Sequence, residues 1–262
     1  MRKIIKKTYG EWAVVTGASS GVGKEMVYQI ASKGINVVLV ARQESLLNEI
    51  ATELEEKYQV KTKVVVVDFE YEDATDNVIN ETKGLEVGIL VNNVGYALTG
   101  EFSENALDNE LALLNVNVKT PMVLAHHFSK QMKERKKGGI IFVSSIMAFG
   151  AAANWASYNA SKAHNLLLAE GMGEELRKYG VNVIALTPGS IKSGFGERSN
   201  TKVMLGALSP KRVAKCGLWM MASGKRTHTA GLVNKIIGLA TRITPRFLNT
   251  KIFSFVVRGM KR

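Results

Sequence analysis

Short runs of apolar, often β-branched residues recur along the chain and alternate with longer stretches that have helical spacing. The six runs are Trp12–Thr16, Asn36–Val40, Lys63–Val67, Gly88–Val91, Ile140–Ser144 and Val181–Leu186. Near-continuous hydrophobicity is typical of parallel strands that are buried on both faces, and strand–helix alternation implies right-handed crossovers. The pattern therefore predicts an α/β protein with a three-layer, doubly wound Rossmann fold and a parallel sheet of about seven strands. In such a fold, ligands bind beyond the carboxyl ends of the strands.

The length of 262 residues fits one large α/β domain with a single core. We expect one domain over residues 1–262, in which a basic N-terminal extension (1–10), a substrate loop with helices (189–225) and a basic C-terminal segment (226–262) flank the Rossmann core. No apolar run approaches the ~18 residues of a membrane span, and the basic start lacks the apolar stretch of a secretory signal. The single cysteine, Cys216, suits a reducing compartment. These features predict a cytoplasmic protein, with membrane association left open.

The net charge of +12 is concentrated at the end of the chain. Residues 198–262 contain 14 Lys/Arg and no Asp/Glu, whereas residues 1–197 contain 21 Lys/Arg and 23 Asp/Glu. The last segment places four apolar residues at helical spacing among basic ones, namely Leu248, Ile252, Phe255 and Val256 with Lys251, Arg258, Lys261 and Arg262.

Three interpretations of this segment stay open. It is an interfacial helix on an anionic membrane, a basic mouth for a phosphate-bearing carrier such as CoA or acyl carrier protein, or a helix that packs over the active site or a neighbouring subunit with its charges solvated. A zinc-finger, helix-turn-helix or RNA-binding motif is lacking, so no nucleic-acid partner is expected.

A glycine-rich turn follows the first predicted strand. The segment Thr16–Gly23 carries glycines at 17, 21 and 23 and leads into a predicted helix from Lys24 to Ser32. Glycines let the backbone turn tightly and approach a pyrophosphate, whose charge is stabilised by the N-terminus of the following helix. Strand, turn and helix occur here in the order that dinucleotide binding requires.

The Gly-x3-Gly-x-Gly spacing resembles that of the short-chain dehydrogenase/reductase family, and later motifs extend the resemblance over residues 11 to about 195. Asn92-Asn93-Val94-Gly95 is similar to the family's Asn-Asn-Ala-Gly turn, and Pro188–Ser193 is similar to its nicotinamide-holding Pro-Gly segment. In the family, an acidic residue at the end of the second strand selects NAD, and a following basic residue favours NADP. The sequence Val40-Ala41-Arg42 lacks a carboxylate and offers a guanidinium suited to a 2′-phosphate, so the resemblance implies NADP(H).

The resemblance also implies individual cofactor contacts. Ser19 would lie near the 2′-phosphate, and Asp68 would face the adenine amine. The complete predicted set is Gly17, Ser19, Ser20, Gly21, Val22, Gly23, Arg42, Asp68, Phe69, Asn93, Gly95, Tyr158, Lys162, Pro188, Gly189, Ile191 and Ser193.

Tyr158 and Lys162 lie four residues apart in a predicted helix from Trp155 to Lys178 and therefore share one helix face. An ammonium group beside a phenol favours the phenolate and lowers its pKa from about 10, as a general acid/base requires. The resemblance assigns this acid/base role to Tyr158, and it assigns to Lys162 both the lowering of that pKa and a contact with the nicotinamide ribose.

Two further residues complete the catalytic set that the resemblance implies. Ser145 stands thirteen residues before Tyr158 and would stabilise charge on the substrate oxygen, whereas Ser144 is one residue too early. Asn117 would hold a water that links the lysine to solvent. Asn115 competes with it, and Asn117 is preferred because a family-like valine precedes it.

The expected function is hydride transfer between NADP(H) and a carbonyl or secondary alcohol. The stretches Tyr9–Gly17, Val67–Phe69 and Gly84–Gly95 are similar to the 17β-hydroxysteroid dehydrogenase and very-long-chain 3-oxoacyl-CoA reductase branch, which implies a small hydrophobic ketone or alcohol as substrate. The alternative is a non-catalytic NADP-binding sensor, or an interaction protein for nucleic acid or membrane, on the same fold. Helices around 105–136 and 155–178 are long enough to pair across a two-fold axis, so we expect a homodimer or homotetramer. The four histidines show no metal-ligating spacing, and no metal is assigned.

Overall fold

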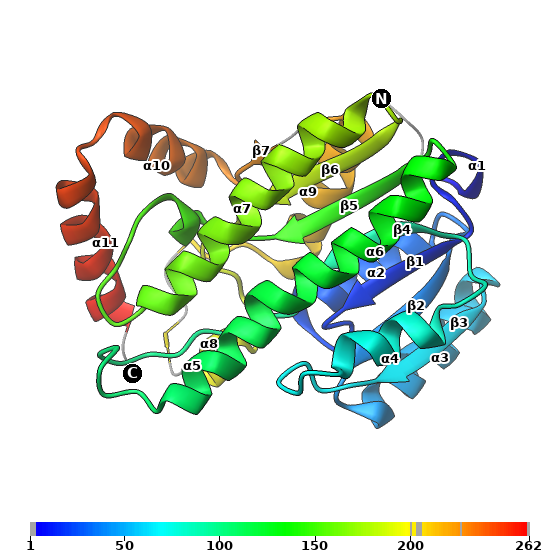
Figure 1. Cartoon of the computed structure of the whole chain (residues 1–262), viewed down its shortest axis with the longest axis horizontal. Coiled ribbons are helices and arrows are strands. Elements are labelled where there is room, and N and C mark those ends of the chain that lie inside the picture. The colour runs from blue at the N-terminus through cyan, green and yellow to red at the C-terminus, as the bar shows by residue number, and fades with distance from the viewer. Residues whose placement is uncertain (1–3, 200, 203–205, 226, 261–262) are drawn as a thin grey trace.

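A parallel sheet forms the centre of the computed structural model, which describes residues 4–199, 201–202, 206–225 and 227–260 (Figure 1). The strands follow the order β3-β2-β1-β4-β5-β6-β7, and each neighbouring pair is parallel. Their bounds are β1 (Trp12–Thr16), β2 (Asn36–Ala41), β3 (Thr62–Val66), β4 (Val87–Asn92), β5 (Gly138–Val143), β6 (Val181–Leu186) and β7 (Thr227–His228). The order reverses between β1 and β4, and this switch point is where open α/β sheets bind ligands.

The doubly wound fold and the six predicted strands are confirmed, with strand ends that differ by two residues or fewer. The sheet has six strands of five or six residues, and β7 has only two residues. The expected number of about seven is therefore reached only when this short edge strand is counted. The run of residues before β7 is basic and polar, and it carries no apolar pattern that could have predicted a strand.

Helices cover both faces of the sheet. The helices α2, α3 and α9 pack on one face, and α4, α6 and α7 pack on the other, which is the near face in Figure 1. The bounds are α1 (Lys6–Tyr9), α2 (Gly21–Ala31), α3 (Glu44–Tyr58), α4 (Ala74–Glu81), α5 (Leu107–Leu114), η1 (Asn115–Lys119), α6 (Thr120–Glu134), η2 (Ile146–Phe149), α7 (Ala156–Arg177), α8 (Phe195–Arg198), α9 (Pro210–Ser223), α10 (Leu232–Ile243) and α11 (Arg246–Met260). The last two, α10 and α11, lie beside the sheet and form an outer corner of the molecule (Figure 1).

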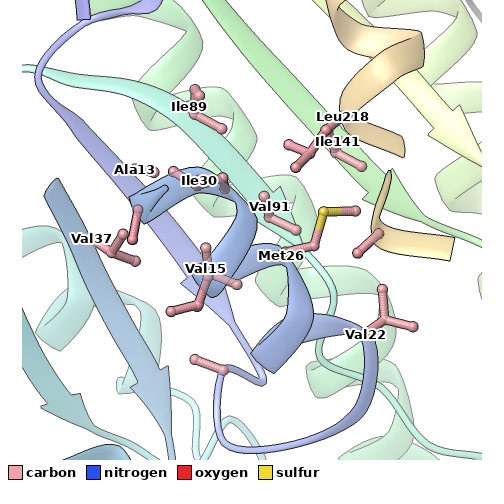
Figure 2. Close-up of a cluster of buried hydrophobic side chains, with 14 of the residues drawn as sticks. Ala13, Val15, Val22, Met26, Ile30, Val37, Ile89, Val91, Ile141 and Leu218 are labelled. Atoms are coloured by element: carbon pink, nitrogen blue, oxygen red, sulfur yellow. The ribbon is translucent and has the colours of Figure 1, made fainter. Parts of the chain in front are cut away.

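Successive residues of each strand enter opposite cores, which explains the continuous hydrophobic runs. In β1, Val15 packs with Met26 and Ile30 of α2, as Figure 2 shows, whereas Val14 packs in the core on the α6 side. Both faces are fully buried, so both strand parities must be apolar. The two cores hold the strand ends in fixed positions, and the functional side chains described below extend from those ends.

Candidate active site

The glycine turn between β1 and α2 has a backbone that other residues would strain or block. Gly17 and Gly21 have φ angles of 66° and 56°, in the left-handed region that favours glycine. A Cβ atom at Gly23 would lie 2.1 Å from the carbonyl oxygen of Gly17, closer than any real contact. Helix α2 begins at Gly21, so its first backbone N–H groups face the space beyond the turn. The geometry is that of an anion-binding helix N-terminus.

Thr16 and Asn93 connect this turn to the end of β4. The Asn93 side-chain amide donates to the carbonyl oxygens of Thr16 at 2.9 Å and Gly17 at 3.3 Å. The Thr16 hydroxyl accepts from the backbone N–H groups of Asn93 at 3.0 Å and Val94 at 3.1 Å, and it donates to Val91 at 3.3 Å. Asn93 therefore holds the glycine turn in place through hydrogen bonds to the protein's own backbone. A contact between Asn93 and the cofactor stays a prediction.

Arg42 and Asp68, which the sequence assigns to the adenosine end, lie together at the ends of β2 and β3. The Arg42 Nη1 atom is 3.3 Å from Asp68 Oδ2 and 3.7 Å from Glu70 Oε1, and the Arg42 side chain is 56% exposed. Exposed ion pairs of this kind contribute about 0–1 kcal/mol. The guanidinium is therefore held only weakly by its two carboxylate partners.

The segment Pro188–Ser193, which follows β6, lies next to both the residues after β5 and the glycine turn. Its first residue accepts a hydrogen bond from the backbone N–H of Ile146 at 2.9 Å. At its other end, a methyl group placed on Gly21 would lie 3.4 Å from Cβ of Ser193. The two predicted cofactor segments, far apart in sequence, thus lie side by side.

Five other predicted cofactor contacts occupy less distinctive positions. Ser19 and Ser20 are half-buried in the glycine turn. Val22 and Phe69 are buried in the two cores, and Ile191 packs partly buried against the core on the α2 side. Their apolar side chains are accounted for by packing, so their contact with a cofactor stays a prediction.

Asn117 lies fully buried in η1, a π-helical turn between α5 and α6. Its side-chain amide donates to the carbonyl of Tyr96 at 2.8 Å and to Ser161 Oγ at 3.1 Å, and its Oδ1 accepts from the Tyr96 N–H at 3.1 Å. Its own carbonyl accepts from the Asn165 side chain at 2.8 Å. The side-chain amide of the competing Asn115 instead donates to the backbone carbonyl of Glu70 at 3.3 Å.

Gly95 brings Asn117 and Lys162 to one point. A Cβ atom on Gly95 would lie 3.0 Å from Asn117 Oδ1 and 3.1 Å from Lys162 Nζ. Only a residue without a side chain leaves both polar groups in place. Gly95, in the turn after β4, therefore lies next to Asn117 and Lys162, which are predicted to supply the proton.

Ser145 and Tyr158 face one another across the end of β5. The Ser145 hydroxyl oxygen accepts from the N–H of Met147 at 3.1 Å, which leaves its proton for a hydrogen bond to the Tyr158 phenol. Its competitor Ser144 turns away and donates to the carbonyl of Lys162 at 2.7 Å. The structure thus places Ser145, and not Ser144, beside the tyrosine.

Lys162 lies one helical turn beyond Tyr158, but the predicted lowering of the Tyr158 pKa by this lysine is wrong for the protein alone. Burial raises the pKa of Tyr158 to about 12, and the hydrogen bond from Ser145 offsets only part of that rise. The ammonium nitrogen lies 5.8 Å from the phenol ring centroid and donates to the Val143 carbonyl at 3.0 Å. Burial also lowers the pKa of Lys162 to about 8, which reduces its positive charge near neutral pH.

Tyr158 belongs to a buried apolar cluster. The Trp155 ring lies 5.1 Å from the Tyr158 ring and the Phe195 ring lies 5.8 Å from it, centroid to centroid. Helix α11, from the end of the chain, adds Phe253 and Val257 to the same cluster. The Tyr158 side chain therefore has a polar partner in Ser145 and apolar neighbours in Trp155 and Phe195.

Comparison with known protein families identifies the family of this chain. The model of the short chain dehydrogenase family matches residues 11–203. The chain belongs to the short-chain dehydrogenase family. It is an oxidoreductase that acts on CH–OH and C=O groups.

Relatives and solved structures in this family resemble the chain over most of its length. A 7β-hydroxysteroid dehydrogenase of Mediterraneibacter gnavus is 32% identical over 80% of this chain and 82% of the relative. The very-long-chain 3-oxoacyl-CoA reductase of Mus musculus is 32% identical over 93% of this chain and 78% of the relative. A solved 7β-hydroxysteroid dehydrogenase structure has a TM-score of 0.89 at 28% identity and covers 95% of this chain and 98% of its own. The L-sorbose reductase of Gluconobacter frateurii, solved with NADPH and L-sorbose, has a TM-score of 0.74 at 25% identity and covers 86% of this chain and 97% of its own.

Several residues of this dehydrogenase site escaped sequence reasoning. Glu70 shares Arg42 with Asp68, and its only signal is a carboxylate two residues after a predicted contact. Asn165 is a buried polar residue three positions after Lys162, which a helical burial pattern could have revealed. Phe253 gives no local signal, because its contact depends on the course of the chain after β7.

In the described part of the chain, no group of three or more His, Cys, Asp or Glu side chains is placed to hold a metal ion. The chemistry available to this dehydrogenase site is that of a phenol, a hydroxyl, a buried amine and an amide.

The pKa of Tyr158 gives this dehydrogenase an expected pH dependence. With Tyr158 as the predicted general acid/base, alcohol oxidation requires its phenolate. Because burial raises the Tyr158 pKa to about 12, we expect the initial rate of oxidation to rise between neutral pH and about pH 10. Ketone reduction uses the protonated phenol and should show no such rise. Initial rates in both directions at saturating cofactor check this, and an oxidation rate that is flat or falls with pH would contradict it.

Proposed function

We propose that this chain is an NADP(H)-dependent reductase of bulky hydrophobic ketones and that Tyr158, Ser145, Lys162 and Asn117 carry the reaction. The observation that carries the proposal is the position of the Tyr158 phenol. It has a hydrogen bond from Ser145, and its ring belongs to an apolar cluster with Trp155. A proton donor in this setting is suited to a carbonyl group on an apolar skeleton.

The residues fit a dinucleotide cofactor. A side chain at Gly23 would fill the cradle at the N-terminus of α2, and the cradle is suited to a pyrophosphate. Arg42 supports NADP over NAD, since a 2′-phosphate offers the guanidinium two charge-assisted bonds in place of an exposed ion pair. When bound, the nicotinamide supplies or accepts the hydride.

The chain's own residues handle the proton and the developing charge. In reduction, the carbonyl oxygen replaces the Tyr158 phenol as the acceptor of the Ser145 proton, and this hydrogen bond stabilises the negative charge that develops on the oxygen. Tyr158 donates its proton to the same oxygen, and its raised pKa keeps that proton available at neutral pH. Lys162, with a pKa of about 8, passes a proton toward the phenolate, and Asn117 positions this end of the relay beside Gly95.

The apolar cluster and the relatives support a hydrophobic substrate. Phe195 and Phe253 belong to segments outside the strands, α8 and α11, that meet at Tyr158. The relatives at about a third identity are hydroxysteroid dehydrogenases and 3-oxoacyl-CoA reductases. We therefore place the substrate among steroid-like ketones and long-chain 3-oxoacyl compounds.

Turnover of a carbonyl panel tests this function. Steroid ketones, long-chain 3-oxoacyl thioesters and short aliphatic aldehydes are offered with NADPH and NADH side by side, and oxidation of the cofactor is followed. We expect turnover of a bulky ketone with NADPH preferred. Tight NADPH binding without turnover of any carbonyl would favour a cofactor sensor instead.

Phe253 should influence substrate choice. Phe253→Leu removes part of a ring in the apolar cluster that includes Tyr158, and we expect kcat/KM for the best bulky ketone to fall about tenfold while a short aldehyde is unaffected. Phe255→Leu, an exposed position on the same helix, is the matched control. Equal losses of kcat/KM for both substrates, or equal effects of the two variants, would show that Phe253 does not take part in substrate recognition.

We also propose that two copies pair through α5, η1, α6 and α7. Leu107, Leu111 and Leu114 are exposed at spacings of four and three on one face of α5, and Met122 of α6 and Leu167 of α7 are exposed as well. A row of exposed leucines on long helices is suited to a two-fold helix bundle.

A further inference from the structure

The helices α10 and α11 expose large apolar side chains on their outer faces. Ile243 is 83% exposed and Phe255 is 79% exposed, and neighbours one turn away on each helix are also exposed. The complete set is Ile236, Ile237, Leu239 and Ile243 on α10 and Phe247, Leu248, Ile252 and Phe255 on α11. We call this set the outer apolar face. At 3.6 residues per turn, Ile236, Leu239 and Ile243 form one stripe, and Leu248, Ile252 and Phe255 form another.

Contacts on the inner side of α11, and between α11 and α10, fix the orientation of these helices and leave the outer apolar face exposed. Phe253 and Val257 are buried in the cluster around Tyr158. Asn249 of α11 donates to the carbonyls of Thr241 at 2.9 Å and Thr244 at 3.2 Å and so ties α11 to the end of α10. The two helices cannot rotate to bury the exposed side chains without breaking these contacts.

Basic side chains border the outer apolar face. Lys235 of α10 and Arg246, Lys251 and Arg258 of α11 are exposed. Lys251 and Arg258 are seven residues apart, so they lie on one side of the Leu248–Phe255 stripe. No acidic residue follows Glu197 in the sequence. Lys261 and Arg262, which belong to the same basic segment, lie outside the described residues.

This combination of charge and apolarity disfavours a second copy of the chain as the occupant. A two-fold contact of the face with itself would bring Lys251 and Arg258 toward their own counterparts with no carboxylate between them. The leucines of α5 offer a separate apolar surface for pairing of copies. A surface with negative charge above an apolar layer complements both the basic border and the apolar side chains of the outer apolar face.

We propose that the outer apolar face of α10 and α11 binds the surface of an anionic lipid bilayer. Leu248, Ile252 and Phe255 enter the boundary between headgroups and acyl chains, and Lys251 and Arg258 contact lipid phosphates and carboxylates. The attachment is peripheral. Over the described residues, no helix has the length and hydropathy needed to span a membrane.

Co-sedimentation of the full chain with vesicles tests this proposal. Vesicles of phosphatidylcholine alone are compared with vesicles of phosphatidylcholine and phosphatidylserine in equal parts, at low and high salt. We expect binding to the anionic vesicles, weakened by salt. Each basic residue near an anionic surface contributes about fivefold in partition, so Lys251→Glu with Arg258→Glu should lower partition at least about tenfold.

Paired variants separate this surface from general stickiness. Ile252→Ser with Phe255→Ser should also lower partition at least about tenfold, whereas Tyr71→Ser with Phe102→Ser, exposed in turns outside α11 and outside the proposed pairing helices, should not. Lys57→Glu with Lys61→Glu is the charge control on another surface. Circular dichroism and NADPH binding establish that each variant is folded.

Two results would overturn the proposal. One is equal partition of the wild type onto neutral and anionic vesicles, or of the α11 variants and the wild type. The other is an absence of vesicle binding together with a fall in oligomer mass, by sedimentation velocity, in Ile252→Ser with Phe255→Ser. That result would assign the face to a second copy.

Discussion

Tyr158→Phe should lower kcat for ketone reduction by about 10²–10⁴-fold, the usual contribution of a positioned general acid. The substitution removes one oxygen and leaves the ring, which packs against Trp155 and Phe195, in place. Binding of NADPH, followed by its fluorescence, should change little, because the glycine turn and Arg42 are untouched. Steady-state oxidation of NADPH with the best ketone measures the loss.

Trp155→Phe is a suitable control, since it alters the same apolar cluster without removing the proton donor. It should cost far less in kcat than Tyr158→Phe. Comparable activity of Tyr158→Phe and the wild type would remove Tyr158 from the reaction, while the family assignment would stand.

Arg42→Ala should raise KM for NADPH by about 10- to 100-fold, because charge-assisted hydrogen bonds contribute about 1.5–3 kcal/mol and each 1.4 kcal/mol is tenfold. The loss is reinforced by Asp68 and Glu70, which then repel the 2′-phosphate with no cation between them. KM for NADH, which lacks that phosphate, should change little. The ratio of the two KM values is the quantity to measure.

Lys33→Ala removes an exposed positive charge at the far end of α2 and serves as the matched control. It should leave both KM values near those of the wild type. A wild type that prefers NADH, or equal effects of Arg42→Ala on both cofactors, would contradict the role of Arg42.

The fold could be predicted from the sequence because its strongest physical requirement is visible in the sequence. A strand buried on both faces is apolar at nearly every position, as in residues 37–41 of β2, and such runs locate the sheet. The glycine turn was equally readable, since positive φ at Gly17 and Gly21 restricts the residue type. Placement of Ser145 and Asn117 over Ser144 and Asn115 came from the family resemblance, and the local contacts agree with it.

Other features depend on tertiary distances that no local pattern encodes. The raised pKa of Tyr158 follows from burial, which the hydrogen bond from Ser145 offsets only in part, and the helical spacing of Tyr158 and Lys162 indicates neither effect. Phe253 joins the cluster around Tyr158 only because of the position that α11 takes after β7 and α10. The two-residue β7 is formed by pairing with β6 and has no apolar run of its own.

The C-terminal helix was anticipated in outline, and its two faces separate the interpretations left open by the sequence. Phe253 and Val257 are buried in the cluster that includes Tyr158, in agreement with a helix that packs at the active site. Ile252 and Phe255 remain exposed among basic residues, which supports our proposal of an anionic membrane surface. Val256, predicted to share the apolar stripe, is only half-buried between these two faces.

The most direct test of the central claim is transfer of deuterium from NADPH labelled at C4 of the nicotinamide. Both C4 epimers are incubated with the protein and the best ketone of the panel, and the product is analysed by mass spectrometry and NMR. We predict a secondary alcohol that carries one deuterium on the carbinol carbon, from one epimer only, and almost none with Tyr158→Phe. Unlabelled ketone recovered intact from every reaction, despite tight NADPH binding, would contradict the claim that this chain is a ketone reductase.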